Sequence, residues 1–253
     1  MAGKGTRLRP FTLTCPKPLI NVLDKPIVEH LIDQITSKVK SNIDEIVYIL
    51  GDESYFNAEV VNSLNLISEK YNAKTKIYRQ LEQLGTGHAI MCAEESLSGP
   101  SIIAYADTMI QGNIEIDTQV DGIMWVKKVD NPSAYGVVNL DNENKIIELI
   151  EKPAEFISDL AVVGIYYFKE AANLRGYLRK HLSEKLSPGK EYLLNYGIEK
   201  MIKNGDSFVP KEIDIWMDCG TPELLLNSTK IIMDTYHDNC LLYTSDAADE
   251  TTG

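Results

Sequence analysis

The first half of the chain alternates between two spacings of apolar residues. Strand patterns cover residues 43–50, 73–80 and 100–107, and the first of them is typical of a buried strand. Helical spacing covers residues 58–71 and 87–97. Strands that alternate with helices at such intervals indicate βαβ units, so the pattern predicts an α/β fold with a mostly parallel mixed sheet.

Beyond about residue 121 the chain becomes richer in strand patterns. These patterns cover residues 122–129, 135–153 and 161–168. A turn signal at residues 142–144 divides the middle pattern into a hairpin. A helical pattern then covers residues 190–205 and ends at Gly205, a residue that suits a helix C-terminus.

The two halves are predicted to form one domain, because the sequence between them shows no Pro- or Gly-rich linker and no internal repeat. We expect this domain to cover residues 1–239, with a first half at residues 1–120 and a β-rich second half at residues 121–239. Residues 240–253 contain small and acidic side chains without periodicity, and this segment is predicted to be a disordered tail.

Composition narrows the classes of protein and partner. The chain has 253 residues and a net charge of -12, which argues against non-specific binding of nucleic acid. No apolar run reaches the roughly 18 residues that span a bilayer, so no membrane segment is expected. The four cysteines are scattered without a Cys-x-x-Cys pair, which argues against a zinc site and favours a reducing cytoplasm.

The most unusual stretch is the basic N-terminus, MAGKGTRLRPFTLTCPKPLI, which contains no acidic residue. Gly3 and Gly5 allow backbone N–H groups to approach a phosphate, while Arg7 and Lys17 supply positive charge. Lys17 stands between two prolines that restrict its backbone. Neither G-x-x-x-x-G-K-[ST] nor G-x-G-x-x-G is present. The combination favours phosphate binding over a merely solvated basic terminus.

The same stretch resembles the signature of the sugar-phosphate nucleotidylyltransferases, G-x-G-T-R-L-x-P-x-T-x-x-x-P-K-P-L. The similarity continues to about residue 235, and within the family it is greatest to the short bacterial glucose-1-phosphate thymidylyltransferases. Further matching stretches are QLGTGHAI, AYADTMI, AYGVV, EKP, AVVGIYYF and WMDCGTPE. The resemblance implies a Rossmann-like three-layer domain with a sugar-binding second half.

The family likeness also implies an activity. Such enzymes join a nucleoside triphosphate to a sugar 1-phosphate and release pyrophosphate, without a Ser or Cys nucleophile. Thymidylyl transfer to glucose 1-phosphate is the first choice, with uridylyl, cytidylyl and guanylyl transfer left open. A different class, a non-catalytic relative that senses a nucleotide sugar, is disfavoured. The charged residues that the family's reaction would need are all present, namely Arg7, Lys17, Asp107, Lys152 and Asp218.

By the same resemblance, the N-terminal loop would hold the triphosphate. Gly3, Gly5 and Thr6 would contact it, while Arg7 and Lys17 would act as catalytic cations on its phosphates and on the departing pyrophosphate.

Two further groups complete the expected nucleotide and metal sites. Gln80 and Gly85 would read the edge of the base, with Gln83 as a competing candidate. Asp107 and Asp218 would bind Mg²⁺, a hard cation that prefers oxygen ligands. Taken singly, Asp107 is also compatible with a strand-end residue and Asp218 with a turn residue.

The sugar phosphate would be held by Gly136, Glu151 and Lys152, with Lys152 as the third catalytic cation. His88 is assigned no catalysis, and Tyr166 is expected to pack in the core.

The resemblance carries two further expectations. Relatives begin with a hydrophobic strand before the glycine loop, so the first strand is expected to be missing here, with reduced stability and activity as the consequence. Many relatives form oligomers, which leaves a homo-oligomer open.

Overall fold

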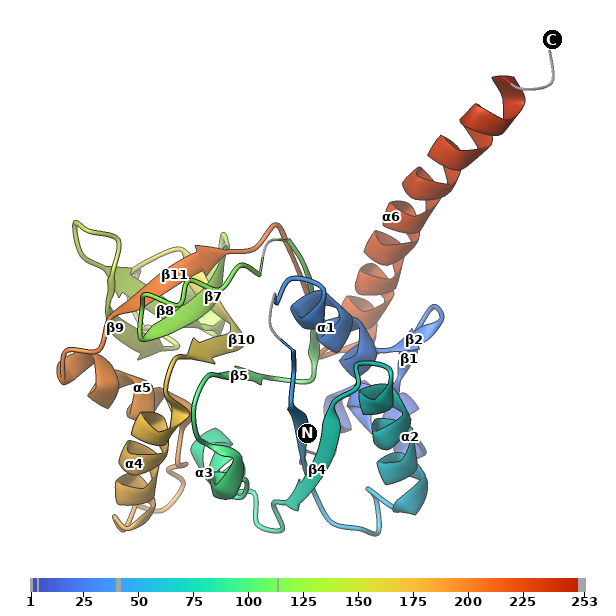
Figure 1. Cartoon of the computed structure of the whole chain (residues 1–253). Helices are drawn as coiled ribbons and strands as arrows, with labels where there is room; N and C mark the ends of the chain where they lie inside the picture. Colours follow the sequence, from blue (N-terminus) through green and yellow to red (C-terminus); the bar gives the residue numbers. More distant parts are fainter. Residues whose placement is uncertain (1, 4, 40–41, 113, 250–253) are drawn as a thin grey trace.

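The computed structural model describes residues 2–3, 5–39, 42–112 and 114–249, with side chains described as far as Thr235. Its first half contains short 3-10 turns, helices and strands in alternation (Figure 1). The 3-10 turns are η1 (Thr6–Leu8), η2 (Phe11–Leu13), η3 (Lys17–Leu19) and η4 (Glu94–Ser96). The helices are α1 (Ile27–Thr36), α2 (Ala58–Glu69) and α3 (Thr86–Met91). The strands are β1 (Asn21–Val22), β2 (Lys25–Pro26), β3 (Glu45–Leu50), β4 (Lys74–Arg79), β5 (Ser101–Ala104) and β6 (Thr108–Gln111).

The second half also has six strands among the described residues, but they are longer on average than those of the first half, in line with its β-rich sequence. The strands are β7 (Gly122–Lys128), β8 (Gly136–Leu140), β9 (Ile146–Glu151), β10 (Leu160–Phe168), β11 (Phe208–Glu212) and β12 (Ile215–Asp218). The helical elements are η5 (Pro132–Ala134), α4 (Ala171–Leu182), α5 (Leu194–Lys203) and α6 (Pro222–Asp249). The predicted hairpin is present as β8–β9, with Asn144 in the left-handed region at φ 62°. Gly205, at φ 98°, follows the end of α5.

Strand β10 is the centre of a six-stranded sheet. It pairs with β7 along one edge and with β8 and β5 along the other, and the order β11-β7-β10-β8-β9 completes the sheet. The mixed α/β sheet is confirmed, but the expectation of mostly parallel pairing is wrong. Of the eight strand pairs among the described residues, only β3–β4 and β7–β11 are parallel. The reason is that β10 inserts between earlier strands and runs against all three.

The core has an apolar layer on each face of this sheet. Met124 and Val126 of β7 pack toward α3, α4 and α5, whereas Ile123 and Trp125 pack toward α1. Both faces of β7 are therefore buried, which accounts for its continuous apolar sequence. Figure 1 shows α3, α4 and α5 grouped together and α1 and α2 grouped elsewhere.

Strands β3 and β4 form a separate parallel pair. In the part of the chain that the structure describes, β5 pairs with β10 alone. A core cluster joins the β3–β4 pair to helices α1 and α2 through residues such as Val28, Leu50 and Leu64.

Helix α6 projects away from the body of the molecule (Figure 1). Its first turns are anchored by Leu225 and Ile232, which pack with Met109 and Met217. The segment 240–249, which the sequence predicts to be disordered, continues this helix, and residues 250–253 lie outside the described residues. Among the described helices, none is long and apolar enough to cross a bilayer.

Candidate active site

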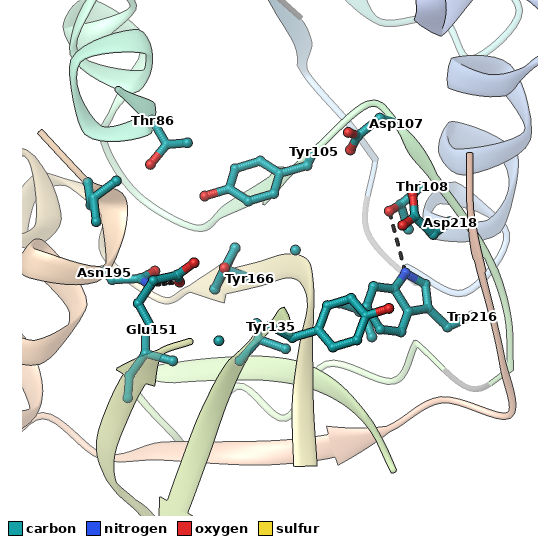
Figure 2. A pocket seen from close by; sticks show the side chains of 16 residues that line it. Thr86, Tyr105, Asp107, Thr108, Tyr135, Glu151, Tyr166, Asn195, Trp216 and Asp218 are labelled. Atoms are coloured by element: carbon teal, nitrogen blue, oxygen red, sulfur yellow. Dashed lines mark hydrogen bonds between the residues drawn. The ribbon is translucent and has the colours of Figure 1, made fainter. Parts of the chain in front are cut away.

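A cleft of about 240 Å³ lies where the two halves of the chain meet. Figure 2 shows Asp107 and Asp218 toward one end and Glu151 with Asn195 toward the other, with Tyr105 and Tyr166 between. The sequence predicts a metal role for the first pair and a sugar role for Glu151. The structure thus brings the two predicted sites into one cavity.

The glycine loop packs against the two 3-10 turns η2 and η3 that follow it. Gly5 takes a left-handed conformation (φ 59°), and its carbonyl accepts a hydrogen bond of 2.8 Å from Thr12 Oγ1. A Cβ at Gly5 would lie 3.0 Å from the Thr12 side chain and 3.3 Å from Lys17 Cβ. Glycine is therefore required here by backbone conformation and by close packing, and it brings the loop against Lys17.

Lys17 fastens this loop to the acidic end of the cleft. It begins η3, and its Nζ lies 3.0 Å from Asp107 Oδ2. The Lys17 side chain is only 11% exposed, whereas that of Asp107 is 52% exposed. Asp107 thus keeps an open side toward the cleft while its charge is partly balanced by Lys17.

Asp107 and Asp218 are neighbours because β6 and β12 pair. Asp218 lies opposite Thr108 in this antiparallel ladder, and Cys219 N donates to Asp107 O at 3.1 Å. Burial raises the pKa of Asp218, and the Asp107 charge adds to that rise, while Lys17 and Arg7 oppose it. Both predicted cations therefore act on this aspartate electrostatically.

The donor set suits Mg²⁺. Two carboxylates converge, and one of them has its charged form disfavoured by the other, a repulsion that a divalent cation would relieve. Within the described ranges no group of three or more His, Cys, Asp or Glu side chains converges. Mg²⁺ commonly takes one or two protein carboxylates and completes its octahedron with water and substrate phosphates.

The sugar end is built on the β8–β9 hairpin. Gly136 lies opposite Glu151 in the ladder, and a Cβ at Gly136 would approach Glu151 Oε2 to 3.1 Å. Asn195 Nδ2 donates to the same oxygen at 3.0 Å. Lys152 follows with φ 46°, and its N–H donates to Tyr135 O at 3.0 Å. Lys152 is exposed and stands outside the cleft lining.

The predicted base-reading residues lie in a loop before α3. Gln80 is buried, and its amide nitrogen lies 3.0 Å from both Gly85 O and His88 Nδ1. The amide group thus closes this loop on itself and leaves Oε1 for other contacts. Gln83, the competing candidate, donates to Ala2 O at 3.5 Å and so lies beside the glycine loop. The role of either glutamine in base reading stays a prediction.

Several cleft residues were missed by sequence reasoning. Tyr105, Tyr135 and Trp216 stand inside the motifs AYADTMI, AYGVV and WMDCGTPE, so their position next to Asp107, Gly136 and Asp218 was a usable signal. The rings of Tyr135 and Trp216 meet edge to face at 4.9 Å and so connect the two ends of the cleft. Thr86 stands inside QLGTGHAI and had the same signal, whereas Asn195 lies in none of these motifs.

Tyr166 is buried, as predicted, yet it also lines the cleft. Its ring meets that of Tyr105 edge to face at 5.9 Å. Burial raises the pKa of both phenols, so both hydroxyls stay protonated at neutral pH and can donate hydrogen bonds.

Comparisons with known proteins place this architecture among enzymes. The chain is 33% identical over 225 residues to the bifunctional protein GlmU of Methanococcus maripaludis, covering 87% of this chain and 50% of that relative. The chain thus spans about half of the relative's length. It is also 30% identical over 232 residues to the UTP–glucose-1-phosphate uridylyltransferase AglF of Haloferax volcanii, covering 88% of this chain and 90% of AglF.

Solved structures share the fold. A nucleoside-diphosphate-sugar pyrophosphorylase from Vibrio cholerae matches with a TM-score of 0.76 at 19% identity, over 91% of this chain and 98% of that one. A candidate glucose-1-phosphate thymidylyltransferase from Bacillus anthracis matches with a TM-score of 0.75 at 23% identity, over 91% and 92%. The sequence model of the nucleotidyl transferase family matches residues 1–235. The chain therefore belongs to the nucleotidyl transferase family of enzymes.

Proposed function

We propose that the protein transfers a nucleotidyl group from a nucleoside triphosphate to a sugar 1-phosphate. The observation that carries the proposal is the convergence, in one cleft, of the Asp107–Asp218 pair with the Gly136–Glu151 site. The acidic pair suits a phosphate-bound cation, and Glu151 suits the hydroxyl groups of a sugar, which are hydrogen-bond donors. Two polyanions could then meet between these ends.

The reaction needs no protein nucleophile. An oxygen of the sugar 1-phosphate attacks the α-phosphorus, the bond from that phosphorus to the bridging oxygen breaks, and pyrophosphate leaves with the electron pair. Arg7 and Lys17 would balance the charge that develops on the leaving group. Gly3, Gly5 and Thr6 would supply the loop that holds the phosphates, and Lys152 would bind the sugar phosphate.

Asp107 and Asp218 would hold Mg²⁺, which when bound neutralises phosphate charge and favours the attack at phosphorus. Lys17 and Asp107 form an ion pair of 3.0 Å. For Asp107 to bind the metal ion, the ammonium group of Lys17 would leave Asp107 and pair with the phosphates of the incoming triphosphate.

The base and sugar are proposed as a pyrimidine and glucose. The thymidylyl motif likeness favours dTTP, and the name of the AglF relative favours UTP. The amide of Gln80 or Gln83 can pair with the edge of either base, which differ only by a methyl group.

The cysteines described, Cys15, Cys92 and Cys219, are unpaired thiols, which supports the proposal of a reducing cytoplasm.

A panel assay of pyrophosphate release tests the proposal. Each of dTTP, UTP, CTP and GTP would be offered with glucose 1-phosphate, N-acetylglucosamine 1-phosphate or mannose 1-phosphate, with Mg²⁺ and then with EDTA. We expect release with a pyrimidine triphosphate and glucose 1-phosphate, lost in EDTA. If no pair of substrates released pyrophosphate, the proposed activity would be refuted and a non-catalytic sensor favoured. Binding of the same ligands by such a sensor would then be detected as a shift in Tm.

A further inference from the structure

The carboxylate of Glu151 is held by a side chain from another element. Asn195, on the first turn of α5, donates its Nδ2 proton to Glu151 Oε2 at 3.0 Å (Figure 2). Gly136 makes this arrangement possible, because its missing side chain leaves room beside the same oxygen. One carboxylate oxygen is thus engaged and the other is left for a ligand.

The start of α5 is itself tied to the first turn of α3 and to the loop that precedes it. Leu194 N donates to Thr86 Oγ1 at 3.0 Å, and Gly87 N donates to Tyr192 O at 2.7 Å. In return, Tyr192 N donates to Leu84 O at 2.8 Å. The backbone of residues 192–194 is therefore clamped to residues 84–87, so the position of Asn195 is fixed from the side of the cleft expected to bind the nucleotide.

We propose that Asn195 is a positioning residue that orients Glu151 toward the hydroxyl groups of the sugar. This inference rests on the proposed function. By occupying Oε2, the amide limits the rotation of the carboxylate and points Oε1 at the ligand. Because Asn195 is neutral, it orients the carboxylate without neutralising its charge.

A double-mutant cycle separates this role from an independent contact. Asn195→Ala, Glu151→Ala and the double variant would be compared in steady-state kinetics. A hydrogen bond to a charged group predicts a rise of about tenfold in the KM for sugar 1-phosphate in Asn195→Ala, with the KM for the triphosphate nearly unchanged. If Asn195 acts through Glu151, the second substitution adds little once Glu151 is gone. Additive effects would overturn the proposal.

The matched control is Asn173→Ala, because Asn173 is an exposed asparagine on the first turn of α4. It should leave both KM values unchanged. Turnover by the unmodified protein in the same assay keeps the two hypotheses apart. If that protein shows no turnover, the proposed function fails; if it turns over but the cycle is additive, the positioning role alone fails.

A charge placed at the same position gives a second readout. In Asn195→Asp two carboxylates would face each other, and both can ionise only at a cost that grows as pH rises. We expect the KM of this variant for sugar 1-phosphate to rise between pH 5 and pH 8, relative to the unmodified protein. A purely structural role would give no such pH dependence, so a parallel profile would overturn the proposal. Neighbouring groups that also bear on this pair are Glu148, Lys152, Glu199, Lys203, Tyr105 and Tyr166.

Discussion

The two ends of the cleft hold their carboxylates by different means. At one end, Asp107 is balanced by the cation Lys17, and Asp218 is partly buried beside it. At the other end, Glu151 is held by the neutral amide of Asn195. A charged partner can be exchanged for another cation, whereas a neutral partner stays in place and only sets direction. The first arrangement suits a site that changes its ions during a reaction, and the second suits a site that recognises a neutral sugar ring.

The acidic end is expected to be the more sensitive to substitution. Asp107→Asn removes one of two converging carboxylates and should lower kcat by about 10²–10³, the cost typical of losing a group that stabilises transition-state charge. The fold should survive, because the Asp107 side chain is half exposed. Asp130→Asn, at an exposed aspartate, is the control. Near-normal turnover of Asp107→Asn would refute its role.

The sugar end should respond through binding. Gly136→Ala places a Cβ 3.1 Å from Glu151 Oε2, so the carboxylate must turn away and the KM for sugar 1-phosphate should rise about tenfold. Gly176→Ala is the matched control, since a Cβ there meets nothing within 4 Å in helix α4. The control should keep its KM and gain stability, because alanine is the better helix former. An unchanged KM in Gly136→Ala would show that the space beside Glu151 Oε2 is not needed for binding of the sugar phosphate.

The exchange of cations at Asp107 can be measured without turnover. Lys17→Met frees Asp107 of its partner, so Mn²⁺ titrated in the absence of nucleotide and followed by electron paramagnetic resonance should bind about two- to fivefold more tightly. That range corresponds to a partly exposed ion pair. Weaker Mn²⁺ binding in Lys17→Met would show that Lys17 supports the metal site instead of competing for it.

The smallest effect concerns stability. The pKa of Asp218 is raised by burial and by Asp107, so the folded protein binds the Asp218 proton more tightly than the unfolded chain does. Its ionised form therefore destabilises the fold at pH 7, and this cost disappears as pH falls below the unfolded pKa. In EDTA, Asp218→Asn should raise Tm by about 2–4 °C at pH 7, the shift that roughly 1 kcal/mol gives in a chain of this size. The gain should shrink toward pH 4, and a constant difference would contradict this origin.

Local patterns predicted elements well and pairing poorly. The strands 43–50 and 73–80, the helix 58–71 and the hairpin of 135–153 are present with bounds shifted by a few residues. The direction of pairing was not readable, because β10 joins β5, β7 and β8 across long stretches of chain. The helical segment 240–249 was also missed, since its sequence has no apolar periodicity.

By itself, the sequence determined the chemistry available: a glycine loop with Arg7 and Lys17, aspartates at strand ends, and Glu151 before Lys152, each recognisable because neighbouring residues form a motif. The tertiary structure alone decided which of these meet. Lys17 contacts Asp107 across 90 positions, and Asn195 contacts Glu151 across 44. Contacts at such separations follow from strand register and helix docking, which depend on the whole core and leave no local spacing in the sequence.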